Sequence, residues 1–318
     1  MSKTQSCNPS RLESEASKSL LRKTPTLWEF FLPEAIEYSE GMDIESLKQN
    51  GHLYVKYPPE LRLAVEESVE AWKAFCELPE EKKILFEYEQ DVKTSGNGYE
   101  LKKSDSSVDV KENAHVRTIA RDLLLFESAK ADPIIGPAFV EKALAVVPLM
   151  QPIIREFART VEKELHVPGF EEDVMAYEPH WLVRYLHYFG DRKVGEELAA
   201  PHTDKGGFTL HLYESAGGVE YLTYDTREWK ELPLSLGETV IIPGVGIQNR
   251  TKCQLKALAH RVIAVEDAAS IGRYSAVCFL NFKNVRFFDK ATFGPQQNYA
   301  PGTFYDMPFE QFDSFFID

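Results

Sequence analysis

Two histidines and one aspartate stand at positions that suit a mononuclear metal site. His202 and Asp204 lie two residues apart in a β-rich stretch, and His260 follows 56 residues after Asp204. Two imidazoles and one carboxylate can occupy three adjacent positions of an octahedral Fe(II) ion, which leaves the others open for a chelating cosubstrate, water and O2. We therefore hypothesise that His202, Asp204 and His260 are the ligands of an iron ion.

A cation and a hydroxyl follow the second histidine. Arg273 and Ser275 flank Tyr274, so their side chains point to the same face of a strand. A guanidinium can bind a carboxylate through two parallel hydrogen bonds, and such a charge-assisted pair contributes about 1.5–3 kcal/mol. The pair therefore suits the far carboxylate of a chelating diacid.

Each of these residues has an ordinary explanation when it is taken alone. The chain has eight histidines, and a His-x-Asp triplet arises by chance in about a third of such chains. An isolated His260 is more often a hydrogen-bonded core residue than a ligand. The order and spacing of all five residues together favour the metal site.

The sequence around these residues resembles the isopenicillin N synthase-like group of Fe(II)/2-oxoglutarate oxygenases. Residues 202–212 (HTDKGGFTLHL) and 217–222 (GGVEYL) are similar to the HTDxGxxTxL…GGLQVL signature of that group. Residues 259–262 (AHRV) are similar to its distal-histidine strand, and Arg273 with Ser275 to its RxS pair. Weaker similarity extends upstream, where residues 75–82 (FCELPEEK) are similar to the FFxLPxEEK helix end of that group.

The resemblance implies a dioxygenase that uses Fe(II), 2-oxoglutarate and O2 and releases succinate and CO2. Its substrate would be a small molecule, plausibly of secondary metabolism, that undergoes hydroxylation, desaturation or ring closure. Arg273 and Ser275 would bind the C5 carboxylate of 2-oxoglutarate. Tyr188 would contact the cosubstrate too, but the asparagine that precedes it in the family pattern is Leu186 here. Tyr188 is therefore either a cosubstrate contact or a core tyrosine.

Two other functions stay open. An oxidase like isopenicillin N synthase would use iron and O2 without 2-oxoglutarate, and an RxS pair occurs in both subtypes. A non-catalytic binding protein could be built on the same fold, although the complete set of five residues weighs against it. Arg117, Arg121 and Arg184 are candidate anchors for an anionic substrate, but surface ion pairing is the more common role of such residues.

The pattern of elements predicts an α+β, mainly β fold. From residue 181 onward short β-rich runs alternate with glycine, proline or charged residues, as in sandwiches and barrels. Before that point apolar residues recur at helical spacing over 63–75 and 137–165. We predict a double-stranded β-helix (jelly roll) core flanked by N-terminal helices. Residues 91–113 are expected to be a loop, and Pro148 and Pro152 to break or kink the second helix.

The same pattern predicts the organisation of the domain. Residues 1–19 are expected to be a disordered tail, and residues 20–318 one oxygenase domain. That domain would consist of a helical part at about 20–175, the jelly roll at about 176–285 and a C-terminal lid or packing segment at 286–318.

Composition limits the possible partners. The net charge of −14 argues against nucleic acid, because phosphates need a basic surface. Eighteen consecutive apolar residues do not occur, so no membrane span is expected. The four cysteines form no CxxC pair, which suits a reducing compartment. We expect a cytoplasmic monomer or weak homodimer that acts on a small molecule.

Overall fold

Two antiparallel β-sheets form the centre of the computed structural model, which describes residues 42–87, 96–103, 108–289 and 301–317. The chain divides into units 1–38 and 39–318, and everything described below belongs to the second. The predicted tail at 1–19 lies outside the described residues.

The larger sheet has seven strands and the smaller one four. The order in the larger sheet is β1 (Leu53–Lys56), β9 (Glu238–Pro243), β6 (Phe208–Glu214), β11 (Arg273–Leu280), β4 (Leu182–Tyr188), β3 (Lys111–Val116) and β2 (Gly98–Lys102). The order in the smaller sheet is β5 (Glu197–Thr203), β10 (Ala259–Ile263), β7 (Val219–Leu222) and β8 (Trp229–Glu231). Side chains of both sheets line one cavity. The predicted jelly roll is confirmed by solved structures of the same fold, which are described below.

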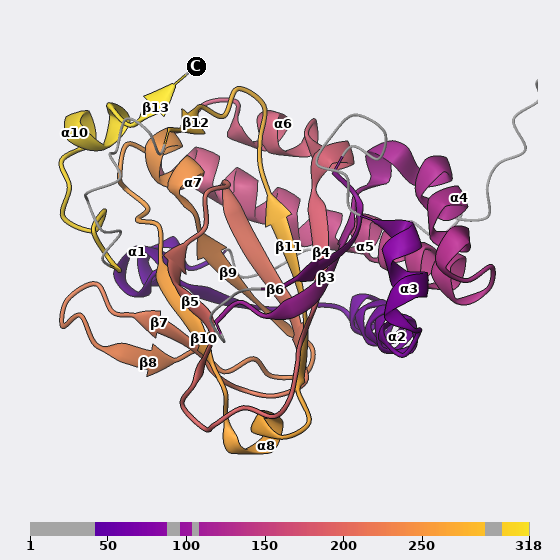
Figure 1. Ribbon diagram of the computed structural model, residues 1–318. Coiled ribbons are helices and arrows are strands. Elements are labelled where there is room, and N and C mark those ends of the chain that lie inside the picture. The colour runs from indigo at the N-terminus through magenta and orange to yellow at the C-terminus, as the bar shows by residue number, and fades with distance from the viewer. Residues whose placement is uncertain (1–41, 88–95, 104–107, 290–300, 318) are drawn as a thin grey trace, which may run out of the picture. The chain divides into compact units, whose positions relative to one another are not determined.

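Helices cover the face of the larger sheet that points away from the smaller one (Figure 1). The main ones are α2 (Pro59–Cys76), α4 (Arg121–Ala131), α5 (Ile135–Glu164) and α6 (Phe170–Met175). Aromatic rings join the two layers: the ring centroids of Phe139 and Tyr185 are 5.1 Å apart, and those of Phe157 and Phe208 are 4.6 Å apart. Because side chains alternate along a strand, β4 presents Tyr185 to the helices and its neighbours to the cavity.

Shorter elements connect these layers. They are α1 (Ile44–Asn50), α3 (Glu80–Lys83), η2 (Ile84–Phe86), η3 (Thr118–Ala120), η4 (Glu178–His180), α7 (Val245–Arg250), α8 (Glu266–Ala269), β12 (Phe287–Phe288), α10 (Phe309–Asp313) and β13 (Phe316–Ile317).

Helix α5 runs unbroken through both prolines, so of the predicted break or kink at Pro148 and Pro152 the break is wrong. Each internal proline costs about 3 kcal/mol through a lost hydrogen bond and a clash. Both prolines lie on the less buried side of the helix, whereas the other side buries residues from Gly136 to Val161. The free energy gained by burying that face outweighs the cost of the two prolines. Among the described helices α5 alone is long and apolar enough to span a membrane, and half of its most apolar stretch is buried inside the protein.

The predicted loop at 91–113 is also wrong where the structure describes it, because strand β2 takes up residues 98–102 and strand β3 begins at residue 111. Strand β3 reads KENAHV and all six residues are buried. Such polar residues do not signal a strand, and they are tolerated in this sheet only because neighbouring side chains satisfy them.

Glu112 of β3 is the centre of that polar network. Its carboxylate accepts hydrogen bonds from Lys83 Nζ at 2.6 Å, Tyr99 Oη at 2.8 Å and the His187 ring nitrogen Nδ1 at 2.7 Å. Burial alone would raise the pKa of Glu112, but the hydrogen bonds from His187 and Lys83 lower it below its ordinary value. The network fixes α3 and η2 against β2, β3 and β4, on the face of the sheet opposite the cavity.

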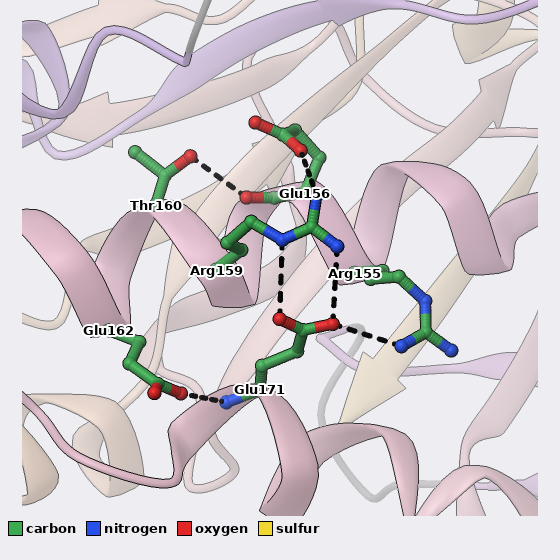
Figure 2. Close-up of polar contacts among 6 residues, drawn as sticks. All are labelled: Arg155, Glu156, Arg159, Thr160, Glu162 and Glu171. Atoms are coloured by element: carbon green, nitrogen blue, oxygen red, sulfur yellow. Dashed lines mark hydrogen bonds and ion pairs between the residues drawn. The ribbon is translucent and has the colours of Figure 1, made fainter. Parts of the chain in front are cut away.

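A second acidic residue joins α5 and α6 at the surface. Figure 2 shows Glu171 between Arg155 and Arg159, with ion-pair distances of 2.9 and 3.3 Å. The Glu162 carboxylate accepts the Glu171 backbone N–H at 2.9 Å. These side chains are partly exposed, so solvent screens their charges and each pair contributes at most about 1 kcal/mol.

The described part of the C-terminal segment is packed into the protein. Phe304, Phe312, Phe315 and Phe316 form a buried cluster with Val245 and Ala257. Tyr305 Oη donates to the Leu222 carbonyl at 2.9 Å and accepts the Ala259 N–H at 2.8 Å. Residues 301–317 therefore support the strand that carries His260.

We predict that Glu112→Gln lowers the free energy of unfolding by about 3 kcal/mol, because Lys83 loses its counter-charge in a buried site. Glu171→Gln, the matched change in an exposed network, should lower it by less than about 1 kcal/mol. Urea denaturation at pH 7 measures both. Equal effects of the two substitutions would contradict the assignment of Glu112 as the buried charge that orders this layer.

Candidate metal centre

The structure brings His202, Asp204 and His260 together at one end of the cavity. His202 on β5 pairs directly with His260 on β10, and Asp204 follows immediately after β5. One ligand atom from each residue lies within 4.8 Å of the other two. The Asp204 atom Oδ1 is 3.8 Å from His202 Nε2 and 4.0 Å from His260 Nε2. The three donors can therefore meet at one metal ion.

Backbone carbonyls orient both imidazoles. His202 Nδ1 is 2.8 Å from the Ala200 carbonyl, and His260 Nδ1 is 3.1 Å from the Leu258 carbonyl. In each ring this places the proton on Nδ1 and leaves the Nε2 lone pair for a metal. Burial and the neighbouring His202 lower the pKa of His260 to about 4, so the ring is in its neutral, metal-binding form at pH 7.

The Asp204 carboxylate is held from the side away from the histidines. Thr209 Oγ1 donates to Asp204 Oδ2 at 2.5 Å, which leaves Oδ1 toward the imidazoles. Burial raises the pKa of Asp204, but the nearby His260 and His202 lower it overall, so the group is ionised at pH 7. Two imidazoles and one carboxylate in this arrangement are the donor set that an open Fe(II) site requires.

The turn after β9 fixes the backbone of the loop that contains Asp204 and Gly206. The N–H groups of Val245 and Gly246 donate to the carbonyls of Asp204 and Gly206, both at 2.8 Å. A Cβ at Gly244 would lie 2.4 Å from the Gly206 carbonyl oxygen, so only glycine allows this approach. The turn at 242–246 thus clamps the loop that carries the carboxylate.

Arg273 and Ser275 lie at the other end of the cavity and line it. Both are buried, and Arg273 Nε is 3.1 Å from the carbonyls of Ala216 and Gly217. Arg273 Nη2 is 2.9 Å from Glu214 Oε2, yet it has no partner in hydrogen-bond geometry. A buried donor without an acceptor is costly, and the far carboxylate of a diacid would satisfy it.

Sequence reasoning missed Glu214. Arg273 lowers the pKa of this buried carboxyl group against the effect of burial, and a hydrogen bond from His211 helps. Glu214 faces the cavity because a register shift between Ala276 and Val277 changes the pairing of β6 with β11. An alternating pattern cannot reveal such a shift. Glu214 lies three residues before Gly217, and this place near the glycine pair does not by itself indicate an inward side chain.

Tyr188 is buried and lines the same end of the cavity. Two cations lie near its ring: Lys111 Nζ is 5.0 Å from the ring centroid, and the Arg273 guanidinium carbon is 5.8 Å from it. Its place beside Arg273 is compatible with the cosubstrate contact that the resemblance implies. Lys111 itself had been assigned to a loop and was missed.

The other predicted residues fall in different places. Arg184 lines the cavity. Arg117 donates to the Gly96 carbonyl, and Arg121 is an exposed residue at the start of α4. His211 also lines the cavity, with its ring centroid 6.1 Å from that of His260.

A jelly roll that directs two histidines and an aspartate into a cavity, with a buried arginine beyond them, defines a class of non-haem iron oxygenases. Residues 177–282 match the model of the 2OG-Fe(II) oxygenase superfamily, and this stretch contains all five residues. This stretch is thus similar to a superfamily whose metal, cosubstrate and oxidant are Fe(II), 2-oxoglutarate and O2.

Two fungal proteins named as 2-oxoglutarate-dependent enzymes are similar in sequence to this chain. A 2-oxoglutarate-dependent dioxygenase of Didymella fabae is 30% identical over 119 residues, which cover 36% of this chain and 35% of that protein. The 2-oxoglutarate-Fe(II) type oxidoreductase hxnY of Emericella nidulans is 26% identical over 74% of this chain and 72% of its own length. The alignment thus spans about a third of the first relative and nearly three quarters of the second.

A solved structure gives the same result for the fold. A putative 2OG-Fe(II) oxygenase family protein from Caulobacter crescentus superimposes with a TM-score of 0.62 at 24% identity. The superposition covers 75% of this chain and 80% of that chain. At this level of identity the likeness establishes the jelly roll and nothing finer.

We predict that Thr209→Val weakens Fe(II) binding about 10–100-fold, because Asp204 loses the hydrogen bond that orients its carboxylate. Thr209→Ser keeps the hydroxyl and should retain most of the affinity. Competition with a chromogenic chelator under argon measures the Fe(II) dissociation constant. An unchanged constant for Thr209→Val would show that the hydroxyl does not position the ligand.

We predict that Arg273→Met has two separable effects. It should weaken 2-oxoglutarate binding at least about tenfold through loss of a charge-assisted hydrogen bond. It should also cost about 3 kcal/mol of stability, since Glu214 is left buried without a cation. Adding Glu214→Gln should recover stability but not 2-oxoglutarate affinity, as measured by calorimetry and urea unfolding. Recovery of affinity in the double variant would place the cosubstrate elsewhere.

Proposed function

We propose that this protein is a dioxygenase that oxidises a small organic molecule with consumption of O2 and 2-oxoglutarate and release of succinate and CO2. The observation that carries the proposal is the distribution of groups in one cavity. Three metal-binding side chains lie at one end, and a buried arginine and serine lie at the other. A diacid that binds a metal through one end needs this arrangement of groups.

The protein residues have distinct tasks in this reaction. His202, Asp204 and His260 would hold Fe(II), which when bound supplies the activation of O2 that protein side chains cannot provide. Arg273 and Ser275 would bind the distal carboxylate of 2-oxoglutarate, with Tyr188 beside them. The apolar lining residues Leu186, Val219, Val262, Val277 and Phe279 exclude water from the space between the two ends.

The substrate is proposed to be a small metabolite, plausibly one of secondary metabolism. The cavity is enclosed by the two sheets, which suits a small ligand better than a polymer. The fungal relatives are named as oxidoreductases and dioxygenases of the same cofactor class, which supports the reaction type. The net charge of −14 supports a site of action away from nucleic acid, as a monomer or weak homodimer, and the four scattered cysteines support a reducing cytoplasm.

A second candidate is an oxidase like isopenicillin N synthase, which uses iron and O2 without 2-oxoglutarate. The ion pair between Arg273 and Glu214 favours this alternative, because the arginine has an acidic partner without any cosubstrate. The two candidates differ in a simple measurement, which is whether O2 consumption requires added 2-oxoglutarate.

We predict that succinate release from 2-oxoglutarate requires Fe(II) and is abolished by Asp204→Ala and by His260→Ala. His180→Gln, which changes a histidine outside the cavity, serves as the control and should retain the wild-type rate. Succinate is quantified by mass spectrometry after incubation with Fe(II), ascorbate and 2-oxoglutarate. Wild-type rates in both ligand variants would contradict the metal assignment, whereas O2 uptake without succinate would favour the oxidase.

A further inference from the structure

Lys111 is a buried cation at the same end of the cavity as Arg273. Both residues line the cavity, and each is less than a tenth exposed: Lys111 8% and Arg273 1%. Tyr188 of β4 pairs with Arg273 of β11 on one side and with Lys111 of β3 on the other. Residues that pair across neighbouring strands direct their side chains to the same face of the sheet. The two cations therefore enter the cavity from one row of the larger sheet.

The two cations are close enough to share one ligand group. Neighbouring strands lie about 4.8 Å apart, so the backbones of Lys111 and Arg273 are about 10 Å apart across β4. Lys111 Nζ is 5.0 Å from the Tyr188 ring centroid, and the Arg273 guanidinium carbon is 5.8 Å from it. Both side chains thus reach the Tyr188 ring, and a carboxylate beside that ring can accept hydrogen bonds from both.

This row is not the one nearest the metal ligands. Thr209, which donates to Asp204, pairs with Phe279 of β11. Phe279 follows Arg273 by six residues along that strand. Lys111 therefore lies at the end of the cavity where the distal carboxylate of 2-oxoglutarate would bind, and not where a substrate must lie to be oxidised.

The charges at this end of the cavity do not balance once a diacid binds. Glu214 Oε2 is 2.9 Å from Arg273 Nη2, and both side chains are buried. The distal carboxylate of a bound diacid would be the second acidic group beside this one guanidinium. Two carboxylates in a buried site repel each other unless a further cation compensates for them. Among the described side chains that line the cavity, Lys111 is the second cation of this row.

The acidic partner of Lys111 is compatible with such a role. Lys111 Nζ is 3.0 Å from Asp109 Oδ1, but the Asp109 side chain is 47% exposed, whereas that of Lys111 is 10% exposed. Solvent screens an ion pair with an exposed member, so the pair contributes little free energy. An ammonium group has three N–H donors. Lys111 can therefore keep Asp109 and also donate to a carboxylate inside the cavity.

We propose that Lys111 is a second residue that binds the distal carboxylate of 2-oxoglutarate, and that it supplies the positive charge that Glu214 neutralises on Arg273. The inference rests on the proposed function, because it adds a residue to the cosubstrate end of the same site. It explains how a buried arginine that already has an acidic partner can still hold a diacid.

The test compares two ligands that differ at the distal end. Full-length protein loaded with Fe(II) under argon is titrated by calorimetry with 2-oxoglutarate and with 2-oxopentanoate. The second ligand has the same chelating end and the same chain length, but a methyl group replaces the distal carboxylate. The wild type should bind 2-oxoglutarate at least about tenfold more tightly than 2-oxopentanoate.

Variants assign part of that difference to Lys111. Lys111→Met should weaken 2-oxoglutarate binding about tenfold and change 2-oxopentanoate binding less than about twofold. Lys111→Arg should retain most of the affinity. Lys102→Met is the matched control, because Lys102 pairs with Lys111 but is exposed, and it should bind both ligands as the wild type does.

Stability separates a binding role from a structural one. The urea midpoint of Lys111→Met should stay close to that of the wild type, because the substitution leaves no buried acidic group without a partner. Lys111→Gln provides a second neutral variant for the same titrations. Unchanged 2-oxoglutarate affinity in the neutral variants, or equal weakening of both ligands, overturns the proposal.

Failure of this inference is distinguishable from failure of the proposed function. Absence of 2-oxoglutarate binding to the Fe(II)-loaded wild type contradicts the proposed function, and the role of Lys111 with it. Normal binding by the wild type together with equally tight binding by Lys111→Met contradicts only the role of Lys111.

Discussion

The direct pairing of His202 with His260 across β5 and β10 is the constraint on which the site depends. It places the two rings side by side, with centroids 4.3 Å apart, and the backbone carbonyls of Ala200 and Leu258 set the orientation of both. Because side chains alternate, a shift of one residue in this register would turn one imidazole to the opposite face of the sheet. The Gly-rich turn after β9 then holds the Asp204 backbone, so the carboxylate completes the set without being part of a strand.

The larger sheet uses its two faces for different purposes. Tyr185 and His187 of β4 point toward the helices, where aromatic packing and the Glu112 network fix the strand. Arg184, Leu186 and Tyr188 point into the cavity. Rigid support on one face lets the other face carry cationic side chains at defined positions along the strands.

The sequence was informative where spacing determines chemistry. The ligand pattern, the RxS pair and the short β-rich runs after residue 181 could be predicted because each is a local signal. Strands β2 and β3 could not, since the polar sequence KENAHV becomes a strand only when Lys83, Tyr99 and His187 satisfy Glu112. The inward orientation of Glu214 could not be predicted either, because it results from a register shift in β6. The persistence of α5 through two prolines depends on tertiary burial, which no local pattern shows.

A second group of possible metal ligands provides an alternative to the site at His202, Asp204 and His260. Cys76, Glu112 and His187 also lie within 4.8 Å of one another, but the Glu112 carboxylate is already bonded to Lys83, Tyr99 and His187. An anomalous difference map from crystals of the protein soaked with Mn(II) tests the assignment most directly. The account predicts one strong peak in contact with His202 Nε2, an Asp204 carboxylate oxygen and His260 Nε2. A peak at the Cys76 cluster instead, or no peak between the two histidines, would contradict it.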